Sequence, residues 1–441
     1  MLTPEEAAAQ ATRLLEMRDS ERPRLDRIHD YLCDDPARRL PGLPEQAPAE
    51  LHRLARISRV NMLKFVVSGR VQAMYVDGYR EPRAADNVAA WDVWQRNRCD
   101  ARQIGVHRAA LAYGAAYVTV LPGTPVPVLR GVSPRRMTAA YGDDDDWPKV
   151  ALERTHSGWR LYDAEAVYLL EAGKGSDGLA AVGSDEHGAG VCPVVRMRET
   201  EDLDDEVVGV VEPLIPLQDQ INITTFGLLV AQHYGAFRQR YIIGWMAEDE
   251  EAKLKASASK LWTFEDSPQE ISVGEFGQTD LSGYIASREA SLRHLATISQ
   301  TPAHELLGEL VNLSADALVA AEASHRRAVT ENQTVMGEGW EQALALAGTL
   351  MGDEPDAAAE VRWRDTESRS MAQVADALGK MAQMLGVPPA ELWEMLPGVS
   401  QQQVERWRAA AAEGDAFARL TSTLQRQAAP AAPAPAAPAE V

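Results

Sequence analysis

The periodicity of apolar residues divides the first 80 residues into helices joined by short breaks. Thr3 and Glu6 have the spacing of a capping box, so a helix is predicted to begin almost at the N-terminus. Pro23 is expected to break or restart that helix. A second amphipathic pattern begins at Asn61 and predicts a helix that exits into a strand and a turn at Asp77-Gly78.

Between residues 86 and 198 the pattern changes from helical to alternating. A helical pair is predicted over residues 86–113, and Gly114 then turns the chain into the strand AAYVTVLPG. Residues 115–171 hold further short alternating runs separated by Gly, Pro and Asp at hairpin spacing, which predicts an antiparallel sheet. Residues 173–190 are predicted to be a loop, after which VCPVVRM returns as a strand.

Two long helical patterns, over residues 213–236 and 279–299, enclose a segment with two strand patterns and an acidic helical stretch. The stretch that follows, SQTPAHELLGELVNLS, is an irregular bridge without Lys or Arg. Pro302 stops the preceding helix there, and Gly308 permits a non-helical backbone. The pattern predicts a short loop between two long helices.

A long, Ala-rich helix is predicted over residues 315–351, and Gly337 and Gly339 are expected to interrupt and kink it. EVRWRD then reads as a strand, and capping boxes that start at Ser370 and Ser400 open short helices before an Ala/Pro-rich end. These patterns predict an α+β fold in which helices dominate and an antiparallel sheet contributes.

The charge balance excludes the usual kind of tight nucleic-acid binder. Acidic residues outnumber basic ones by 65 to 44, which gives a formal net charge of −21, whereas such binders cluster Lys and Arg against phosphates. Three widely separated cysteines form neither a disulfide framework nor a zinc spacing and are expected to be packing residues. No run of eighteen apolar residues predicts a membrane span, and a cytosolic site of synthesis is expected.

Motifs that would carry chemistry are incomplete. AGKGSDG lacks the upstream Gly of a phosphate-binding loop, His304-Glu305 lacks the second His of a zinc hydrolase helix, and there is no G-x-S-x-G elbow. Asp143 to Asp146 could recruit a cation or form a solvated hairpin tip. His233, His294 and His325 could form a pH-responsive or metal-binding cluster or ordinary interface hydrogen bonds. We predict no metal, no cofactor and no enzyme activity.

The order helix, α/β insert, helix, short bridge and long helix resembles the portal proteins of tailed double-stranded DNA bacteriophages over nearly the whole chain. Each motif is weak alone, but their order and spacing are specific. The resemblance is carried by NMLKFVVSGRVQAMYVDGY, ALAYGAAYVTV, SPRRMTAAYGDD, PLIPLQDQINITTFGLLVAQHYGAFRQRYIIG, SADALVAAEA and VRWRDTESRSMAQVADALGKM.

The resemblance implies a ring, usually of twelve subunits, that sits at one capsid vertex of the virion after assembly in the host cytoplasm. The implied divisions are a wing (1–212), a first stem helix (213–236), an α/β clip (237–278), a second stem helix (279–299), a tunnel loop (300–314), a long kinked wing helix (315–351), a helical crown (352–427) and a disordered Ala/Pro tail (428–441). The implied partners are further copies of the chain, double-stranded DNA that passes through without sequence specificity, the large terminase motor subunit, a head-to-tail adaptor protein, the major capsid protein and a scaffold protein, but no membrane.

The candidate site residues follow from that mapping. Those expected to face the DNA channel from the tunnel loop are His304, Glu305, Glu309 and Asn312, and those expected to pack loop against loop are Leu306, Leu307, Leu310 and Val311. The clip residues expected to face the motor or adaptor are Glu248, Asp249, Glu250, Lys253, Trp262 and Glu265. The acidic balance suits a channel that must not hold DNA, since phosphate contacts repeated around a ring would retain the duplex.

Two other functions remain open at this point. One is a head-associated, metal-assisted nuclease or protease that uses His304, Glu305 or Asp143 to Asp146. The other is a helical structural adaptor without a channel. The bridge after residue 299 could also be a buried helix-to-helix turn that does not contact DNA.

Overall fold

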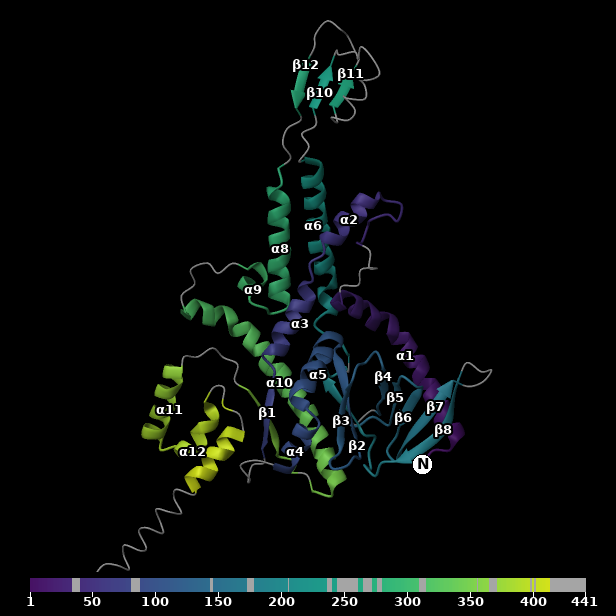
Figure 1. Ribbon diagram of the computed structural model, residues 1–441, viewed down its shortest axis with the longest axis vertical. Coiled ribbons are helices and arrows are strands. Elements are labelled where there is room, and N and C mark those ends of the chain that lie inside the picture. Colours follow the sequence, from purple (N-terminus) through teal and green to yellow (C-terminus); the bar gives the residue numbers. More distant parts are fainter. Residues whose placement is uncertain are drawn as a thin grey trace, which may run out of the picture.

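The computed structural model describes residues 1–33, 40–80, 88–142, 146–172, 178–204, 206–235, 240–243, 261–264, 272–275, 280–308, 315–354, 356–364, 371–396, 399 and 402–412. Figure 1 shows an elongated molecule in which a pair of long helices, α6 and α8, rises from a broad body of helices and sheets. A small group of helices near the C-terminal end lies beside that body, and a small sheet caps the helix pair. This arrangement confirms the predicted, mainly helical α+β fold.

Helix α1, Pro4–Cys33, begins at the predicted capping box. The Thr3 N–H donates to Glu6 Oε2 at 2.8 Å, and the Glu6 N–H donates to Thr3 Oγ1 at 3.3 Å. The break predicted at Pro23 is wrong, because the helix continues through this residue. The first half of the helix buries Leu14 against the sheet that contains β5 to β8, and the second half buries Ile28 in the main core. This packing on both sides of Pro23 outweighs the free-energy cost of a proline inside a helix.

The predicted antiparallel sheet is two sheets. One has the order β4-β5-β6-β7-β8 and the other the order β3-β2-β9, and all their pairings are antiparallel. The bounds of the first are Met137–Ala140 (β4), Val150–Arg154 (β5), Trp159–Tyr162 (β6), Ala166–Ala172 (β7) and Leu179–Glu186 (β8), and those of the second are Val128–Val132 (β3), Ala115–Leu121 (β2) and Val194–Arg198 (β9). Strand β8 falls within the predicted loop 173–190, so that part of the prediction is wrong. Strand β8 pairs with β7 from Leu179 onward. Most of its residues are exposed, so its sequence lacks the alternation of apolar and polar residues by which a half-buried strand is recognised.

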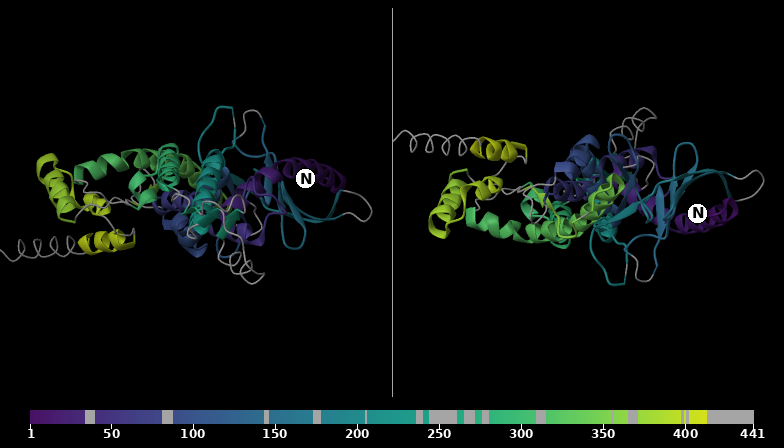
Figure 2. Two further views of the ribbon diagram at one scale, coloured as in Figure 1. Left: turned by 90° about the horizontal axis from the view of Figure 1, so that it is seen from above. Right: turned by 90° about the horizontal axis from the view of Figure 1, so that it is seen from below.

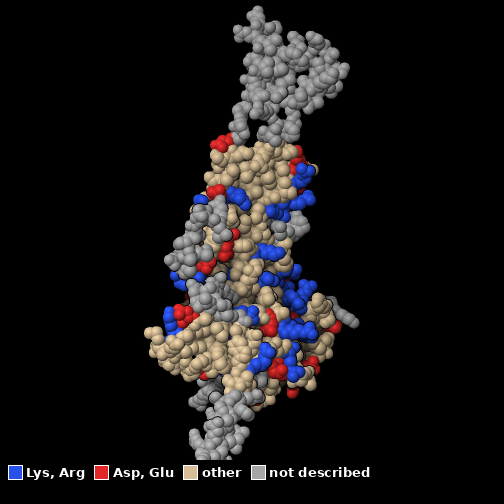
Figure 3. Space-filling model, turned by 60° about the vertical axis from the view of Figure 1, so that its left-hand side comes forward, with Lys and Arg blue, Asp and Glu red and all other residues tan. Residues whose placement is uncertain are grey.

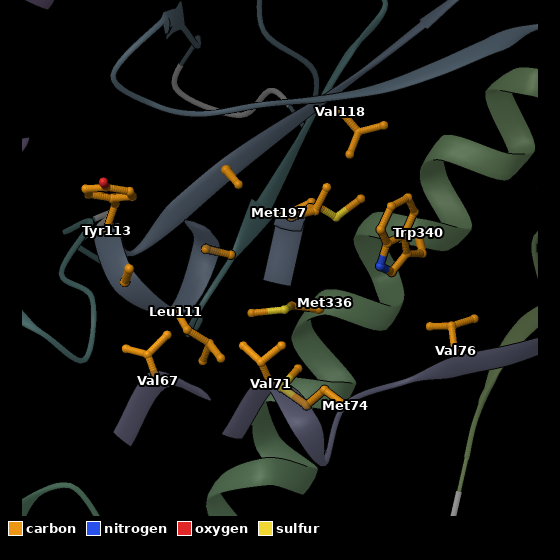
Figure 4. Packing of buried hydrophobic residues seen from close by; sticks show 14 of the residues in the cluster. Val67, Val71, Met74, Val76, Leu111, Tyr113, Val118, Met197, Met336 and Trp340 are labelled. Atoms are coloured by element: carbon orange, nitrogen blue, oxygen red, sulfur yellow. The ribbon is translucent and has the colours of Figure 1, made fainter. Parts of the chain in front are cut away.

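The main core lies where α5 (Cys99–Tyr113) and α10 (Ala315–Met351) pack on the three-stranded sheet. Helix α3 (Met62–Gln72) packs against α5, and helix α4 (Val88–Arg96) packs against both α5 and α10. Figure 4 shows side chains from α3, α5, β2, β9 and α10 converging, among them Val71, Leu111, Met197 and Trp340. Trp340 is 1% exposed, so the long helix is part of the same core as the N-terminal region.

Strand β1, Val76–Arg80, pairs antiparallel with β13, Glu360–Trp363. The turn predicted at Asp77-Gly78 is therefore wrong, because both residues lie within β1, at an irregularity in its register. The buried Asp77 carboxylate accepts a hydrogen bond from Arg362 Nε at 2.9 Å. A pair of residues that favours turns locally is here held in a strand by a partner almost 300 residues away.

Gly337 and Gly339 do not interrupt α10, which is continuous over 37 residues. A Cβ at Gly339 would lie 2.6 Å from Met197 Sδ of β9, and one at Gly337 would lie 3.4 Å from Val361 of β13. The two glycines thus allow the helix to approach two strands closely.

The helix pair consists of α6, Ile215–Gly235, which follows the 3-10 turn η1 (Glu212–Leu214), and α8, Ser282–Ile298. Helix α2, Ala49–Ile57, packs beside α6. The sheet above the pair has the order β11-β10-β12, with bounds Arg240–Ile243 (β10), Leu261–Phe264 (β11) and Ser272–Glu275 (β12). Strand β12 was not predicted. The C-terminal elements are α11 (Met371–Leu385), α12 (Pro389–Leu392), η2 (Trp393–Met395) and a helix over residues 402–412.

Replacing Gly209 by Ala is expected to destabilise the fold by about 1–3 kcal/mol. A Cβ at Gly209 would lie 2.5 Å from both the Ala112 carbonyl oxygen and the Gly114 nitrogen, and neither backbone atom can rotate away. The matched control is Gly105→Ala in α5, where nothing lies within 4 Å of the added Cβ and a gain of about 0.5–1 kcal/mol is expected. Thermal unfolding of both variants checks this, and an unchanged midpoint for Gly209→Ala would contradict it.

Candidate functional site at the end of helix α8

The bridge predicted after the second long helix contains a short helix, α9, Ala303–Leu307. His304 is half-buried and Glu305 is exposed on it. Leu306 is buried in the main core of its own chain, and Leu307 packs against that core. Both leucines therefore make apolar contacts within one subunit, without a neighbouring copy. The other predicted residues of the bridge, Glu309, Leu310, Val311 and Asn312, lie outside the described residues.

The end of α8 is fixed by backbone geometry. The Ser299 N–H donates to the Leu295 carbonyl at 2.9 Å, and the Thr301 N–H donates to the Ala296 carbonyl at 3.0 Å. Between them Gln300 has a φ of +52°, a left-handed conformation that is usually taken by glycine at helix ends. Pro302 then extends the chain into α9. The backbone therefore reverses abruptly where the predicted tunnel loop begins.

A buried arginine holds this reversal in place. Arg70 lies on α3 and is 6% exposed. Its Nη2 donates to the Ser299 carbonyl at 2.8 Å, and its Nη1 donates to Asn332 Oδ1 of α10 at 3.3 Å and lies 3.4 Å from Glu199 Oε1. Asn332 Nδ2 donates in turn to the Glu199 carbonyl at 2.8 Å. We call Arg70, Glu199, Ser299 and Asn332 the joint, because they tie α3, the end of β9, α8 and α10 together.

Burial opposes both charges of the joint. It lowers the pKa of the Arg70 guanidinium and raises the pKa of the Glu199 carboxyl, and the attraction of each ion for the other works against these shifts. Each charge is therefore stable in the interior only while its partner is present.

A groove of about 490 Å³ lies beside the joint, between α3, α9 and α10. Glu305 lines it together with His325 and Arg326. Burial lowers the pKa of His325 and the nearby Glu305 opposes that shift, while Arg326 pairs with Glu322 at 3.2 Å. The groove is lined by two carboxylates, those of Glu305 and Glu322, and by two arginines, Arg326 and Arg364.

The other predicted site residues are placed as follows. Trp262 lies on β11, whereas Glu248, Asp249, Glu250, Lys253 and Glu265 lie outside the described residues. His233 pairs with Glu50 of α2. Of Asp143 to Asp146, only Asp146 is described. Within the described ranges no three His, Cys, Asp or Glu side chains come close enough to hold a metal ion, and no described helix is long and apolar enough to cross a bilayer.

The joint was missed by sequence reasoning. Arg70 stands among Val66, Val67 and Val71 on the buried face of α3, and a lone arginine within an apolar stripe is a signal for a buried charge. Its partners could not have been named, because Glu199 and Asn332 are 129 and 262 residues away.

The fold is similar to that of a chain from a gene transfer agent, in a structure described as the neck of the native particle computed with C12 symmetry. The TM-score is 0.51 and the sequence identity 16%, and the match covers 82% of this chain and 96% of that one. The chain therefore shares its fold with a chain of that structure. It belongs to the SPP1 Gp6-like phage portal protein family, whose family model matches residues 12–415.

Two curated relatives agree with this assignment. The portal protein of Mycobacterium phage D29 is 25% identical over 410 residues, which cover 84% of this chain and 82% of the relative. The portal protein of Mycobacterium phage L5 is 24% identical over 420 residues, with 85% and 83% covered. The predicted resemblance to portal proteins is confirmed.

Proposed function

We propose that this portal protein forms a ring of twelve copies at one capsid vertex of a virion and provides the channel for DNA packaging and ejection. Membership of the portal family carries the proposal, and the C12 symmetry in the description of the similar neck structure supports the number. The ring acts as a structural conduit, with no chemistry of its own. Its partners are double-stranded DNA, the large terminase subunit, a head-to-tail adaptor, the major capsid protein and a scaffold protein.

Within this ring the helix pair α6–α8 is the stem, the sheet β11-β10-β12 belongs to the clip, and residues 300–314 form the tunnel loop. Glu305 is exposed just beyond the joint, so a rigid attachment holds a carboxylate at the start of the loop. Repeated around a ring, such carboxylates repel a polyanion and let it slide. The side chains at 248–250, 253, 262 and 265 face the motor or adaptor.

The ring is tested by imaging the purified protein and measuring its mass. Class averages from electron microscopy should show closed rings with rotational symmetry, and mass photometry should give about twelve times 48.2 kDa. A protein that stays monomeric under all conditions of concentration and salt would contradict the proposal.

Replacing Glu305 by Lys is expected to slow DNA packaging or ejection several-fold while rings still assemble. Each copy would then offer a phosphate contact, and contacts summed around a ring bind DNA in a strongly salt-dependent way. The matched control is Glu16→Lys, which makes the same change of charge at an exposed site on α1. Packaged DNA per head and the ejection rate are measured for both, and equal DNA transit in both variants would remove Glu305 from the channel.

A further inference from the structure

Helices α2, α3 and α5 each carry an exposed apolar side chain with exposed cations close to it in the sequence. Ile57, Phe65 and Ile104 are 60%, 43% and 37% exposed. The exposed cations around them are Arg53, Arg56, Lys64 and Arg108, and none of the four pairs with a carboxylate of the described residues. We call these seven residues the basic face. It is unexpected in a chain with a net charge of −21.

A surface of the opposite kind follows strand β9. Leu203 is fully exposed there, between the acidic residues Glu201, Asp202 and Asp204. Glu201 also lines a groove of about 420 Å³ with Glu338 of α10 and with Asp146 and Asp356. We call Leu203, its chain neighbours Glu201, Asp202 and Asp204, and the groove carboxylates of Asp146, Glu338 and Asp356 the acidic face.

The cations near the acidic face are already engaged. Arg198 pairs with Glu201 at 2.6 Å, and the guanidinium of Arg196 stacks over the Tyr141 ring at 4.2 Å from its centroid. The groove is lined by five carboxylates, those of Asp146, Glu201, Glu338, Glu341 and Asp356, and by these two arginines, so this surface is acidic overall.

The two faces are carried by different elements, the basic face by α2, α3 and α5 and the acidic face by the segment after β9 and by α10. In both views of Figure 2 the blue helices near residue 100, which include α5, lie to one side of the green helix α10. Figure 3 shows a column of Lys and Arg side chains down the right-hand side of the body, below the helix pair. A ring joins neighbours through two different surfaces of each copy, so it needs two complementary faces of this kind.

We propose that the basic face of one subunit docks on the acidic face of the next copy, an inference that rests on the proposed ring. The exposed apolar side chains would be buried at the centre of this interface, with Leu203 against the patch formed by Ile57 and Phe65, and the charges would surround them. Copies with a large net negative charge repel each other at long range. The local complementarity of the two faces selects the one orientation that closes a ring.

The test reverses each face in the full-length protein. One variant is Arg53→Glu/Arg56→Glu, and the other is Glu201→Lys/Asp204→Lys; all four sites are exposed, and thermal unfolding confirms that both variants fold. Each variant alone should form at least ten-fold fewer rings than the wild type at low salt. Mixed one to one, they should form rings again by alternating, because the reversed basic face of one variant then meets the reversed acidic face of the other, and at the next interface the two natural faces meet, with opposite charges at both interfaces.

The matched control for the basic face is Arg13→Glu/Arg154→Glu, which changes the charge equally at exposed sites on α1 and β5. This control should assemble like the wild type. Reversed variants that form rings as readily as the wild type, or a mixture that forms no more rings than its components, would overturn the inference and leave the ring itself standing. If the wild type does not form rings, the proposed function fails. The mixture then still tests the docking, because the two variants should associate with each other more strongly than either does with itself.

Discussion

Replacing Arg70 by Met is expected to lower the free energy of unfolding by about 3–5 kcal/mol, because the change leaves a carboxylate buried without its counterion. The Glu199 side chain is 13% exposed, and burial already raises its pKa with Arg70 present. The variant also loses the 2.8 Å hydrogen bond to the Ser299 carbonyl that fixes the end of α8. Urea unfolding followed by tryptophan fluorescence at one fixed protein concentration measures the loss.

Two further variants distinguish the effect on stability of an unpaired buried charge from the effect of losing any arginine. Arg326→Met removes a more exposed arginine that pairs with Glu322 on the same helix and should cost less than about 1 kcal/mol. Arg70→Met/Glu199→Gln removes both buried charges and should recover part of the loss. A loss below 1 kcal/mol for Arg70→Met, or a double variant that is no more stable than the single one, would show that the joint is not held by paired charges.

The joint also matters for the channel. Because it ties α8 to α3 and α10, the start of the proposed tunnel loop cannot shift relative to these helices without separating Arg70 from at least one partner. In assembled rings of Arg70→Met we therefore expect altered DNA retention in addition to lower stability. The glycine variant Gly209→Ala lowers stability elsewhere, so it should not change retention if its rings still form.

Local signals in the sequence predicted those parts of the fold that local interactions decide. The capping box at Thr3 and Glu6 forms as predicted, and Gly114 turns the chain between α5 and β2 with a φ of +93°. The predictions at Pro23, at Asp77-Gly78 and over β8 were wrong because in each place tertiary contacts decide the structure. Pairing with β13 holds Asp77-Gly78 in a strand, and pairing with β7 creates β8.

The candidate site could be predicted only in part for the same reason. The order of helices and the residues Pro302 and Gly308 placed the bridge correctly between α8 and α10, and Gly308 ends α9 with a φ of +69°. The short helix α9 and the joint beneath it depend on side chains from three other segments of the chain. No spacing within the bridge itself indicates that Arg70 holds the Ser299 carbonyl.

His107 is expected to make the main core unstable in acid. This side chain is completely buried, and burial lowers its pKa to about 4. Its Nδ1 lies 3.3 Å from the Met74 carbonyl oxygen, and its Nε2 accepts a hydrogen bond from Trp340 Nε1 at 2.8 Å. The neutral ring thus has both nitrogens satisfied, and a proton on Nε2 would face the indole N–H.

The pH dependence has a definite sign. Between about pH 6.5 and pH 4 the unfolded chain takes up a proton on His107 that the folded chain does not, so this part of the stability is complete above pH 6.5 and is lost as the pH falls. The loss approaches about 3 kcal/mol at pH 4. Carboxyls whose pKa burial raises, such as Glu199 and Glu341, act in the opposite direction, so the contribution of His107 must be read from a comparison of variants.

The comparison is between the wild type, His107→Gln and His156→Gln, unfolded in urea at pH 7, 6, 5 and 4. His107→Gln removes the titrating group, and although it weakens the fold at pH 7, its stability should fall less steeply than that of the wild type as the pH is lowered. His156 is exposed, so His156→Gln should follow the wild type at every pH. The fluorescence of Trp340, which is hydrogen-bonded to His107, changes with the loss of this contact. A stability difference between the wild type and His107→Gln that stays constant from pH 7 to pH 4 would mean that burial of this neutral imidazole does not cause the loss of stability in acid.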